Sequence, residues 1–365
     1  MKAQTIIEKL IKLSDEFIVY FDNLKGCAQD PEWNAEGDVW NHTLNVIVES
    51  IKISEEKNLS EKDTEILLYS AALHDIGKPY SSTIEDGRIR SHGHSKLGYK
   101  ITNQILSKTD YPFQDKLQIM NLIKYHGKPN WVYDNDNPEY EVIKMSMDCR
   151  LDLLYYLSVA DFKGRIANDT NECLLNIDIF AEYAKELNCF GNKYQFKSNI
   201  AKFNYLVKMN IYHTDEPYDD TRSKVILMSG LPGTGKDTFI SKNYPNIPVV
   251  SLDDIRKELK LKPNETGRVI QIAKERARQY LRKGENFIWN ATNTSKQTRE
   301  SLIELFNTYK AFIVINYVYT NFNKCVKRNR SREDVVPYEV LEKMLMKQEI
   351  PMCIESHRVN YFEII

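Results

Sequence analysis

The sequence predicts a multidomain protein in which an all-α domain is followed by an α/β domain with a parallel sheet. The chain has 365 residues, and single hydrophobic cores stop growing at roughly 250 to 300 residues. Apolar residues recur at helical spacing through the first half, whereas short β-rich runs alternate with helical stretches from Lys224 onward. We expect domains at 1–212 and 224–365, joined by the polar, acidic linker 213–223.

The spacing of apolar residues predicts the following helices and strands, given in chain order. Helical segments of the first half include WNHTLNVIVESIKI, TEILLYSAALHDIGK and LDLLYYLSVADFKGR. No stretch of that half predicts a strand. In the second half, the parallel strands are expected at VILMS, IPVVS, NFIWN and AFIVINYVY. Helices over 266–283 and 296–309 are expected to cover the sheet.

Composition indicates a globular chain, with 42% hydrophobic and 28% charged residues. No stretch approaches the ~18 apolar residues needed to cross a bilayer, so no membrane partner is expected. The N-terminal MKAQTIIEKLIKLSDEF has helical spacing and lacks the continuous apolar segment of a secretory signal. Six cysteines form no C-x-x-C pair, which favours reduced thiols and a cytoplasmic location.

Charge is distributed unequally between the halves. From Lys224 onward, 24 Lys and Arg stand against 16 Asp and Glu, a net charge of +8, whereas the remainder has 26 against 35, a net charge of −9. A basic half is expected of a domain that binds a polyanionic substrate, although solvated helix faces contribute to such an excess.

A set of histidines and aspartates in the first half predicts a metal centre. His74 and Asp75 are adjacent on one predicted helix, and neighbouring predicted helices add further candidates. The candidate ligands are His42, His74, Asp75, His94, His126 and Asp161. Imidazole and carboxylate groups suit divalent transition metals. One such histidine alone would more commonly be a hydrogen-bonded side chain, but the complete set favours metal binding.

The order H…HD…H…H…D over residues 35–170 resembles the HD phosphohydrolase superfamily. The stretches LLYSAALHDIGKP and GHSKLGYKI are especially similar to the HD modules of tRNA nucleotidyltransferases and metal-dependent phosphohydrolases. The resemblance implies one or two divalent transition metals such as Mn²⁺, Ni²⁺ or Co²⁺. The first ion would be held by His42, His74, Asp75 and Asp161, and the second by His94, His126 and a bridging Asp75. Two such ions can activate a hydroxide for phosphoester hydrolysis.

Two cations near these ligands are candidates to bind the phosphate. Lys78 follows the His-Asp pair by one turn, and Arg165 follows Asp161 by one turn. Lys78 also precedes Pro79 at a predicted helix end, where the helix dipole alone favours a cation. His92 competes with His94 as a ligand, but G-H-x-x-x-G matches at His94, so His92 is expected to lie outside the ligand set.

The stretch GLPGTGKDT, residues 230–238, directly follows the predicted strand VILMS. It matches the phosphate-binding pattern G-x-x-x-x-G-K, but Asp237 stands where the pattern has a hydroxyl for magnesium. Backbone amides ahead of a helix form an anion site whatever that side chain is. We expect ATP or another NTP, with Mg²⁺, to bind Gly230, Gly233, Thr234, Gly235, Lys236, Asp237 and Thr238. Lys236 would reach the phosphates, Asp237 would contact the metal, and Thr238 would offer its hydroxyl.

Two further motifs predict the phosphoryl-transfer residues. In SLDDIRKEL, Asp253 can accept a hydroxyl proton and Arg256 follows three residues later. The alternative for Asp253 is a helix cap that satisfies backbone amides. In KRNRSREDVVP, Arg328 and Arg332 are four apart, so we expect them to share one helix face and point at the same phosphates.

The motifs D-D-x-R and R-N-x-x-R resemble the phage polynucleotide kinase family over residues 224–350. The resemblance implies that Asp253 is the general base, that Arg256 holds the acceptor's phosphate, and that Arg328 and Arg332 are lid arginines. WNATN departs from that family, because Asn290 replaces the Asp of its D-x-T-N motif.

A helical HD module followed by such a kinase resembles the bacterial HD-Pnk end-healing family. The resemblance implies a 5′-OH polynucleotide kinase joined to a 2′,3′ phosphohydrolase, acting on RNA or DNA ends with an NTP donor. Because the chain has no K-x-D-G motif, sealing would need a separate ligase. A homo-oligomer is compatible with this organisation.

Two alternatives to this function stay open. In the first, a nucleoside-type small-molecule kinase is fused to an HD nucleotide phosphohydrolase; in the second, the HD module only binds RNA. The basic charge of the second half and Arg256 favour the polymer, since a small neutral acceptor offers no backbone phosphate.

Overall fold

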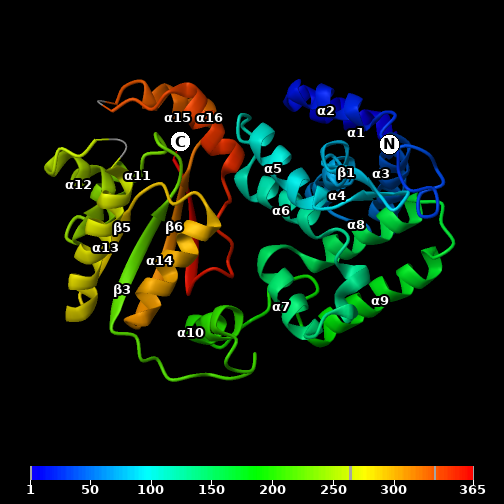
Figure 1. Cartoon of the computed structure of the whole chain (residues 1–365). Helices are drawn as coiled ribbons and strands as arrows, with labels where there is room; N and C mark the ends of the chain where they lie inside the picture. Colours follow the sequence, from blue (N-terminus) through cyan, green and yellow to red (C-terminus); the bar gives the residue numbers. More distant parts are fainter. Residues whose placement is uncertain (1, 263–264, 333, 365) are drawn as a thin grey trace. The chain divides into compact units, whose positions relative to one another are not determined.

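Figure 1 shows the computed structural model of the chain, which describes residues 2–262, 265–332 and 334–364. The chain divides into two compact units, a helical unit, Met1–Gln195, and a sheet unit, Phe196–Ile365. The expected boundary after residue 212 lies C-terminal to this division. Residues 196–212 join the sheet unit because Phe203 is part of its core and stacks on His357, with ring centroids 3.9 Å apart.

The helical unit has one continuous apolar core to which its first and last helices both contribute. Its helices are α1 (Ala3–Leu13), α2 (Glu16–Leu24), α3 (Val39–Glu56), α4 (Glu61–Leu73), α5 (His94–Leu106), α6 (Phe113–Tyr125), α7 (Pro138–Asp148), α8 (Leu151–Gly164) and α9 (Thr170–Glu186), with short 3₁₀ turns η1 (Lys78–Tyr80) and η2 (Pro129–Asp134). Local sequence fixes several helix starts. Asp38 accepts a hydrogen bond from the Asn41 amide to cap α3, and Ser60 accepts one from the Asp63 amide to cap α4.

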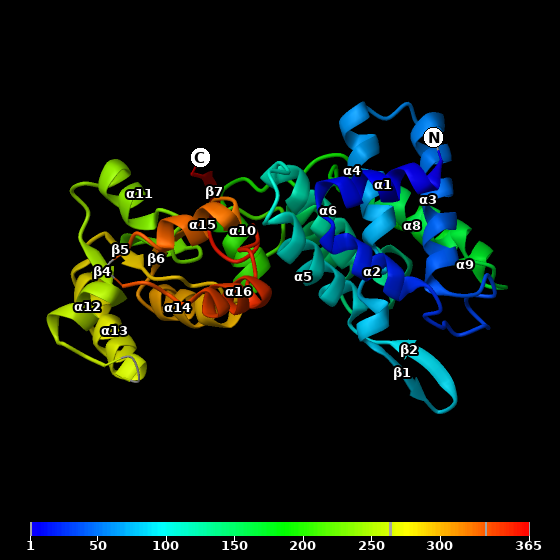
Figure 2. The ribbon, with the colours of Figure 1, turned by 90° about the horizontal axis from the view of Figure 1, so that it is seen from above.

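The prediction that the first half contains no strand is wrong. Strands β1 (Ser82–Glu85) and β2 (Arg88–Ser91) form an antiparallel hairpin, which Figure 2 shows projecting from the helices of its unit. Its turn is Asp86-Gly87, and both residues have positive φ angles, 52° and 76°. Asp-Gly is a typical two-residue hairpin turn. The strands are short and largely solvent-exposed, so they carry no apolar alternation that would reveal them.

The sheet unit confirms the predicted α/β fold with a parallel sheet. Its strands are β3 (Ser223–Ser229), β4 (Val249–Ser251), β5 (Phe287–Asn290), β6 (Ala311–Tyr319) and β7 (Arg358–Glu363). Its helices are α10 (Asn199–Phe203), the π-helical turn η3 (Asn204–Lys208), α11 (Lys236–Asn243), α12 (Leu252–Glu258), α13 (Thr266–Lys283), α14 (Lys296–Thr308), α15 (Phe322–Asn329) and α16 (Tyr338–Lys347). Among the described residues, no helix is both long and apolar enough to cross a membrane.

The strand order β4-β5-β3-β6-β7 places β3 in the middle, and every neighbouring pair is parallel. Alternate β3 residues face opposite layers, since Val225 and Leu227 pack with α13 and α14 while Ile226 and Met228 pack with α11. Parallel strands end at one edge of the sheet. The phosphate-binding loop after β3, the start of α12 after β4, and Asn290 at the end of β5 therefore lie at that edge.

A buried ion pair ties α14 to the segment before β7. Arg299 is completely buried and makes two hydrogen bonds to Glu355, at 2.6 and 2.9 Å. Its Nη1 also donates to the carbonyl oxygens of Asn293 and Glu349. The guanidinium is thus bonded on both sides, which is the condition under which a buried charge is tolerated.

We expect Arg299→Met to lower the free energy of unfolding by about 3 to 5 kcal/mol, because it leaves the Glu355 carboxylate buried without its partner. The matched control is Lys296→Ala on the same helix. Lys296 forms a solvent-exposed pair with Glu300 at 3.3 Å, and such pairs contribute about 0.3 to 0.5 kcal/mol. Urea unfolding followed by circular dichroism measures both variants. Equal transition midpoints for the two would contradict a structural role for the buried pair.

Candidate active sites

The six histidines and aspartates predicted as ligands converge in the helical unit. Each comes from a different position: His42 lies within α3, His74 and Asp75 follow the end of α4, His94 begins α5, His126 follows the end of α6, and Asp161 lies in α8. The expected location of the His-Asp pair on one helix is therefore corrected to the end of α4. Four of the six are buried, namely His42, His74, Asp75 and His126, whereas the side chains of Asp161 and His94 are 13% and 23% exposed.

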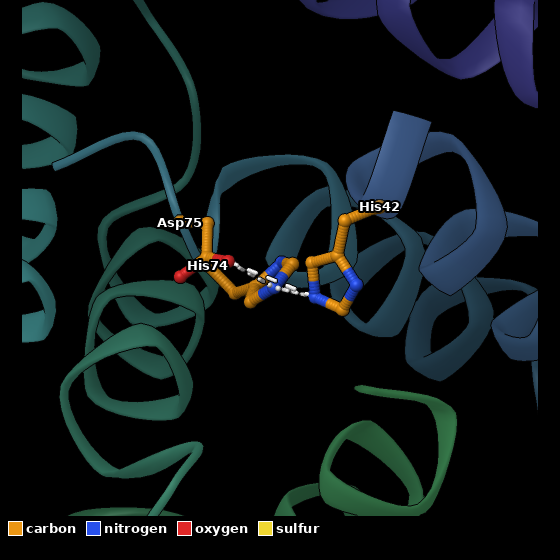
Figure 3. A group of neighbouring side chains, drawn as sticks. All are labelled: His42, His74 and Asp75. Atoms are coloured by element: carbon orange, nitrogen blue, oxygen red, sulfur yellow. Dashed lines mark hydrogen bonds and ion pairs between the residues drawn. The ribbon is translucent and has the colours of Figure 1, made fainter. Parts of the chain in front are cut away.

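One ligand trio is formed by His42, His74 and Asp75, whose ligand atoms lie within 4.8 Å of one another (Figure 3). The two histidine Nε2 atoms are 3.3 Å apart, and His74 Nε2 lies 3.1 Å from Asp75 Oδ2. Asp161 extends this trio, because its Oδ1 lies 3.0 Å from His42 Nε2.

A second trio uses the other oxygen of the same carboxylate. Asp75 Oδ1 lies 3.4 Å from His94 Nε2 and 3.9 Å from His126 Nε2, and the two histidine atoms are 3.2 Å apart. Asp75 therefore stands between the two trios, with one oxygen directed to each. This is the arrangement that the bridging role requires.

The hydrogen bonds of the rings show that these trios fit divalent cations. Nδ1 of His74, His94 and His126 each lies 2.7 to 2.8 Å from a backbone carbonyl oxygen. A carbonyl only accepts, so Nδ1 carries a proton, and Nε2, which faces the centre, is the nitrogen that can offer a lone pair to a metal. Within the described residues, buried Asp75 Oδ1 has no hydrogen-bond partner. Metal bonds of about 2.0 to 2.2 Å place neighbouring ligand atoms roughly 3 to 3.5 Å apart, which matches the distances above.

Protonation favours ligation by the second trio. Burial lowers the pKa of His126 to about 4 and lowers that of His94 from its ordinary value, so both rings are neutral at pH 7. Burial alone would raise the pKa of Asp75, but the neighbouring His74 and Lys78 hold it well below its usual range. Burial also opposes the charged form of His42, yet the carboxylates of Asp161 and Glu36 raise its pKa to about 9.

Two polar residues beside the centre were not predicted. Glu36 Oε1 lies 3.0 Å from His42 Nδ1, on the side of the ring opposite Asp161. Gln29 accepts a hydrogen bond from Lys78 Nζ at 2.7 Å, which holds the lysine beside the centre. Both lie in the irregular segment between α2 and α3, where no periodic pattern marks them.

The two predicted phosphate-binding cations of this unit differ in position. Lys78 Nζ lies 2.7 Å from Asp75 Oδ2, directly beside the trios. The Arg165 guanidinium instead lies over the Phe162 ring, 3.9 Å from its centroid, and pairs with Asp169 at 3.3 Å. His92 is 70% exposed at the surface and pairs with Glu85, outside the ligand set.

The phosphate-binding loop of the sheet unit is fixed by close backbone approaches. Gly230, Gly233 and Gly235 all have positive φ angles. A Cβ at Gly230 would lie 2.2 Å from the Val318 carbonyl oxygen, and one at Gly233 would lie 2.5 Å from that of Cys325. Only glycine fits these two positions. Thr234 donates its hydroxyl to the Leu231 carbonyl at 2.9 Å, so this side chain closes the loop from within.

Lys236 begins α11 and is half-buried under the loop. Its Nζ donates to the carbonyl oxygens of Gly230 and Leu231, both at 2.9 Å. Burial lowers the pKa of Lys236 to about 8, although the nearby Asp237 opposes this change. The ammonium group is thus held by two backbone carbonyls, from which it can turn to an incoming phosphate.

A cavity of about 1310 Å³ brings the predicted kinase residues together. It is lined by Lys236, Asp237, Thr238, Asp253, Arg256, Arg328 and Arg332, among others. The helix-cap alternative for Asp253 is wrong, because Ser251 Oγ caps α12 by accepting from the Asp254 amide at 3.2 Å. The Asp253 carboxylate is 66% exposed instead, 3.3 Å from Arg256 and 3.6 Å from Arg332.

The expectation that Arg328 and Arg332 share one helix face is also wrong. Helix α15 ends at Asn329, whose side chain donates to the Val336 carbonyl at 2.7 Å and accepts from the Val336 amide at 3.2 Å. These bonds turn the chain back on itself, so Arg332 lies in the following turn. Both arginines still line the same cavity.

Asp237, which stands where the loop pattern has a hydroxyl residue, contacts Asn290 at the end of β5. Asp237 Oδ1 accepts a hydrogen bond from Asn290 Nδ2 at 2.7 Å. Asn293, three residues further, is structural: its Nδ2 donates to the Met228 carbonyl at 2.6 Å and joins this turn to β3.

Metal content tests the two-trio arrangement. After loading with Mn²⁺ and gel filtration, we expect two ions per wild-type chain, one in His126→Ala and less than one in Asp75→Ala, because Asp75 belongs to both trios. His92→Ala is the matched control and should retain two. Elemental analysis measures the stoichiometry, and retention of both ions by Asp75→Ala would contradict the bridging role.

Comparisons with known proteins agree with this division of the chain. An HD domain model matches residues 39–161, and an AAA domain model matches residues 225–351. The A-adding tRNA nucleotidyltransferase of Deinococcus radiodurans is 31% identical over 88 residues, which are 23% of this chain and 20% of that protein. The chain therefore spans about a fifth of that relative.

A solved structure from Chloroflexus aurantiacus, provisionally described as a kinase, is 17% identical and covers 40% of this chain and 86% of its own, with a TM-score of 0.34. That score is too low to support an argument about the fold. The two domain matches and the architecture together support a fusion of an HD domain to a P-loop, kinase-like domain.

Proposed function

We propose that this chain is a bifunctional nucleic-acid end-healing enzyme. Its sheet unit would transfer a phosphoryl group from an NTP to a 5′-OH end, and its helical unit would hydrolyse 2′,3′-cyclic phosphate or 2′- or 3′-phosphate ends. The observation that carries the proposal is the convergence of Lys236, Asp253 and three arginines on one cavity. A phosphate loop supplies a donor site, and a carboxylate beside arginines supplies an acceptor site.

In the kinase reaction, the 5′ oxygen forms a bond to the γ-phosphorus while the bond from that phosphorus to the β,γ-bridging oxygen breaks. Asp253 accepts the proton of the hydroxyl, since its carboxylate is exposed to the cavity rather than used as a helix cap. Lys236 and the loop amides hold the donor phosphates, and Arg328 and Arg332 balance charge on the transferred group. Mg²⁺, when bound, neutralises the phosphates and orients them.

In the phosphohydrolase reaction, the six histidines and aspartates hold one or two divalent transition metals, of which Mn²⁺, Ni²⁺ and Co²⁺ suit this ligand set. The metals, when bound, supply Lewis acidity and a hydroxide at neutral pH. Lys78 is held beside Asp75 by Gln29 and places an ammonium group where an anionic phosphate would approach. Arg165 can join it only by leaving Asp169.

Features of the cavity favour a polymer over a small acceptor. Its volume of about 1310 Å³ leaves room for an acceptor beside the NTP that the same cavity must hold. Arg256 lies beside Asp253, and Lys257 and Lys260 also line the cavity. Lys257 pairs with Asp334 at 3.1 Å, so backbone phosphates would compete with Asp253 and Asp334 for these cations, an interaction that a neutral nucleoside does not offer. Both activities convert ends left by 2′-hydroxyl attack into ends that a separate ligase can join.

The kinase assignment is tested by Asp253→Asn, with labelled ATP and a 5′-OH oligonucleotide or free nucleosides as acceptors. We expect oligonucleotide labelling to fall about 10²- to 10⁴-fold, as for loss of a general base, while ATP affinity is unchanged. The control is Asp254→Asn, since that neighbouring carboxylate does not line the cavity. Label found only on nucleosides would refute the polynucleotide kinase, whereas full oligonucleotide labelling by Asp253→Asn would refute the role of Asp253 as the general base.

The phosphohydrolase assignment is tested on RNA ending in a 2′,3′-cyclic phosphate. We expect Asp75→Ala to abolish phosphate release and to leave 5′-OH labelling intact, because Asp75 holds both ligand trios and belongs to the other unit. Asp253→Asn should give the reverse pattern. Loss of both activities in Asp75→Ala, in a protein whose circular dichroism is unchanged, would argue against two separate centres.

A further inference from the structure

The phosphate-binding loop carries a carboxylate at Asp237, and the neighbouring strand carries an amide at Asn290. In phosphate-binding loops, the residue after the lysine carries a hydroxyl for magnesium, and an aspartate at a second position also holds the ion. Here position 237 carries the aspartate, and Asn290 at the end of β5 carries an amide. A single carboxylate is therefore present at this pair of positions, and it lies on the loop.

The two side chains meet because their elements are neighbours. β5 pairs with β3 in parallel, with Leu227 opposite Trp289, so Asn290 lies beside the end of β3. Its Nδ2 donates to Asp237 Oδ1 at 2.7 Å, and both residues line the cavity that contains Lys236. Since a carboxylate can only accept, this bond fixes which end of the Asn290 amide faces Asp237.

This hydrogen bond leaves two oxygens for a ligand, Asn290 Oδ1 and Asp237 Oδ2. Asn290 Oδ1 is buried and has no hydrogen-bond partner within the described residues. An unsatisfied buried acceptor is costly, and such a group calls for a partner. Asp237 is an exposed residue that lines the cavity, and its Oδ2 is not the oxygen that accepts from Asn290. A carboxylate oxygen and an amide oxygen side by side suit a hard cation such as Mg²⁺, bound directly or through water.

We propose that Asp237 is the carboxylate that binds magnesium in the nucleotide site and that Asn290 is the residue that positions it. The inference rests on the proposed function, since it requires a nucleotide in the loop. A carboxylate at position 237 also repels a triphosphate that lacks its metal ion. Nucleotide binding should therefore depend on Mg²⁺ more strongly than it would with a serine at this position.

The test measures ATP affinity by calorimetry with Mg²⁺ and with EDTA. In the wild type we expect Mg²⁺ to tighten binding at least tenfold. In Asp237→Ser, metal-free ATP should bind more tightly than in the wild type, and the gain from Mg²⁺ should fall below threefold. The double variant Asp237→Ser with Asn290→Asp places the carboxylate on the strand instead of the loop. It should recover most of the tenfold gain in ATP affinity from Mg²⁺.

Two further variants separate positioning from stability. Asn290→Ala should reduce the gain from Mg²⁺ without changing the affinity for metal-free ATP or the melting temperature. Ser241→Ala is the matched control on α11, because Ser241 is exposed and donates only to the Thr238 carbonyl. Binding of Mn²⁺ with ADP, followed by electron paramagnetic resonance, should show the same order of variants.

The outcomes distinguish this inference from the proposed function. If Asp237→Ser binds ATP with the full gain from Mg²⁺, the carboxylate is not the magnesium ligand, although the kinase assignment stands. If the double variant fails to recover the gain while it still folds and binds ATP, the proposal that positions 237 and 290 share one magnesium site is wrong. If the wild type binds no nucleotide under any condition, both the inference and the kinase assignment fail.

Discussion

The helical unit depends on the burial of a single carboxylate, Asp75, which is 2% exposed. Burying a charge is costly unless it is paired or coordinates a metal. Each of its oxygens faces a pair of histidine nitrogens, and three of those rings have committed their other nitrogen to a backbone carbonyl. Lys78 Nζ lies 2.7 Å from one of these oxygens, and the converging nitrogen and carboxylate atoms favour a further cation between them. Because the residues stand at the end of α4, the start of α5 and the end of α6, the centre joins three helices of the unit.

In the sheet unit, the candidate phosphate site is formed by the backbone of the loop and not by metal ligands. Its glycines allow the loop to approach β6 and α15 closely, which leaves amides and Lys236 to receive phosphate. Ser251 takes the capping role at α12 and so releases Asp253 to the cavity, where Arg256 and Arg332 hold it. Because Ser251 caps the helix, the Asp253 carboxylate is not needed for capping and remains exposed to the cavity.

Many features of the fold and of the candidate sites could be predicted from the sequence, because they depend on local sequence patterns. Helical and strand periodicity predicted the two fold classes, the glycine spacing predicted the loop, and the order of histidines and aspartates predicted six candidate ligands that lie close together in the structure. Long-range contacts were not accessible. Glu36 meets His42 from an irregular segment, the fold assigns residues 196–212 to the sheet unit through Phe203, and α15 ends where Asn329 binds the returning chain. None of these contacts leaves a periodic pattern, since each depends on residues distant in sequence or on a turn.

The proposed activity of the helical unit depends on Asp75 as a bridge between two metal ions. Crystals soaked with Mn²⁺ and measured on both sides of the manganese absorption edge test it most directly. Two anomalous peaks about 3.5 to 4 Å apart, one beside each Asp75 oxygen and each contacted by its own histidine pair, are the predicted result. A single peak that involves only His42 and His74, or peaks remote from Asp75, would contradict it.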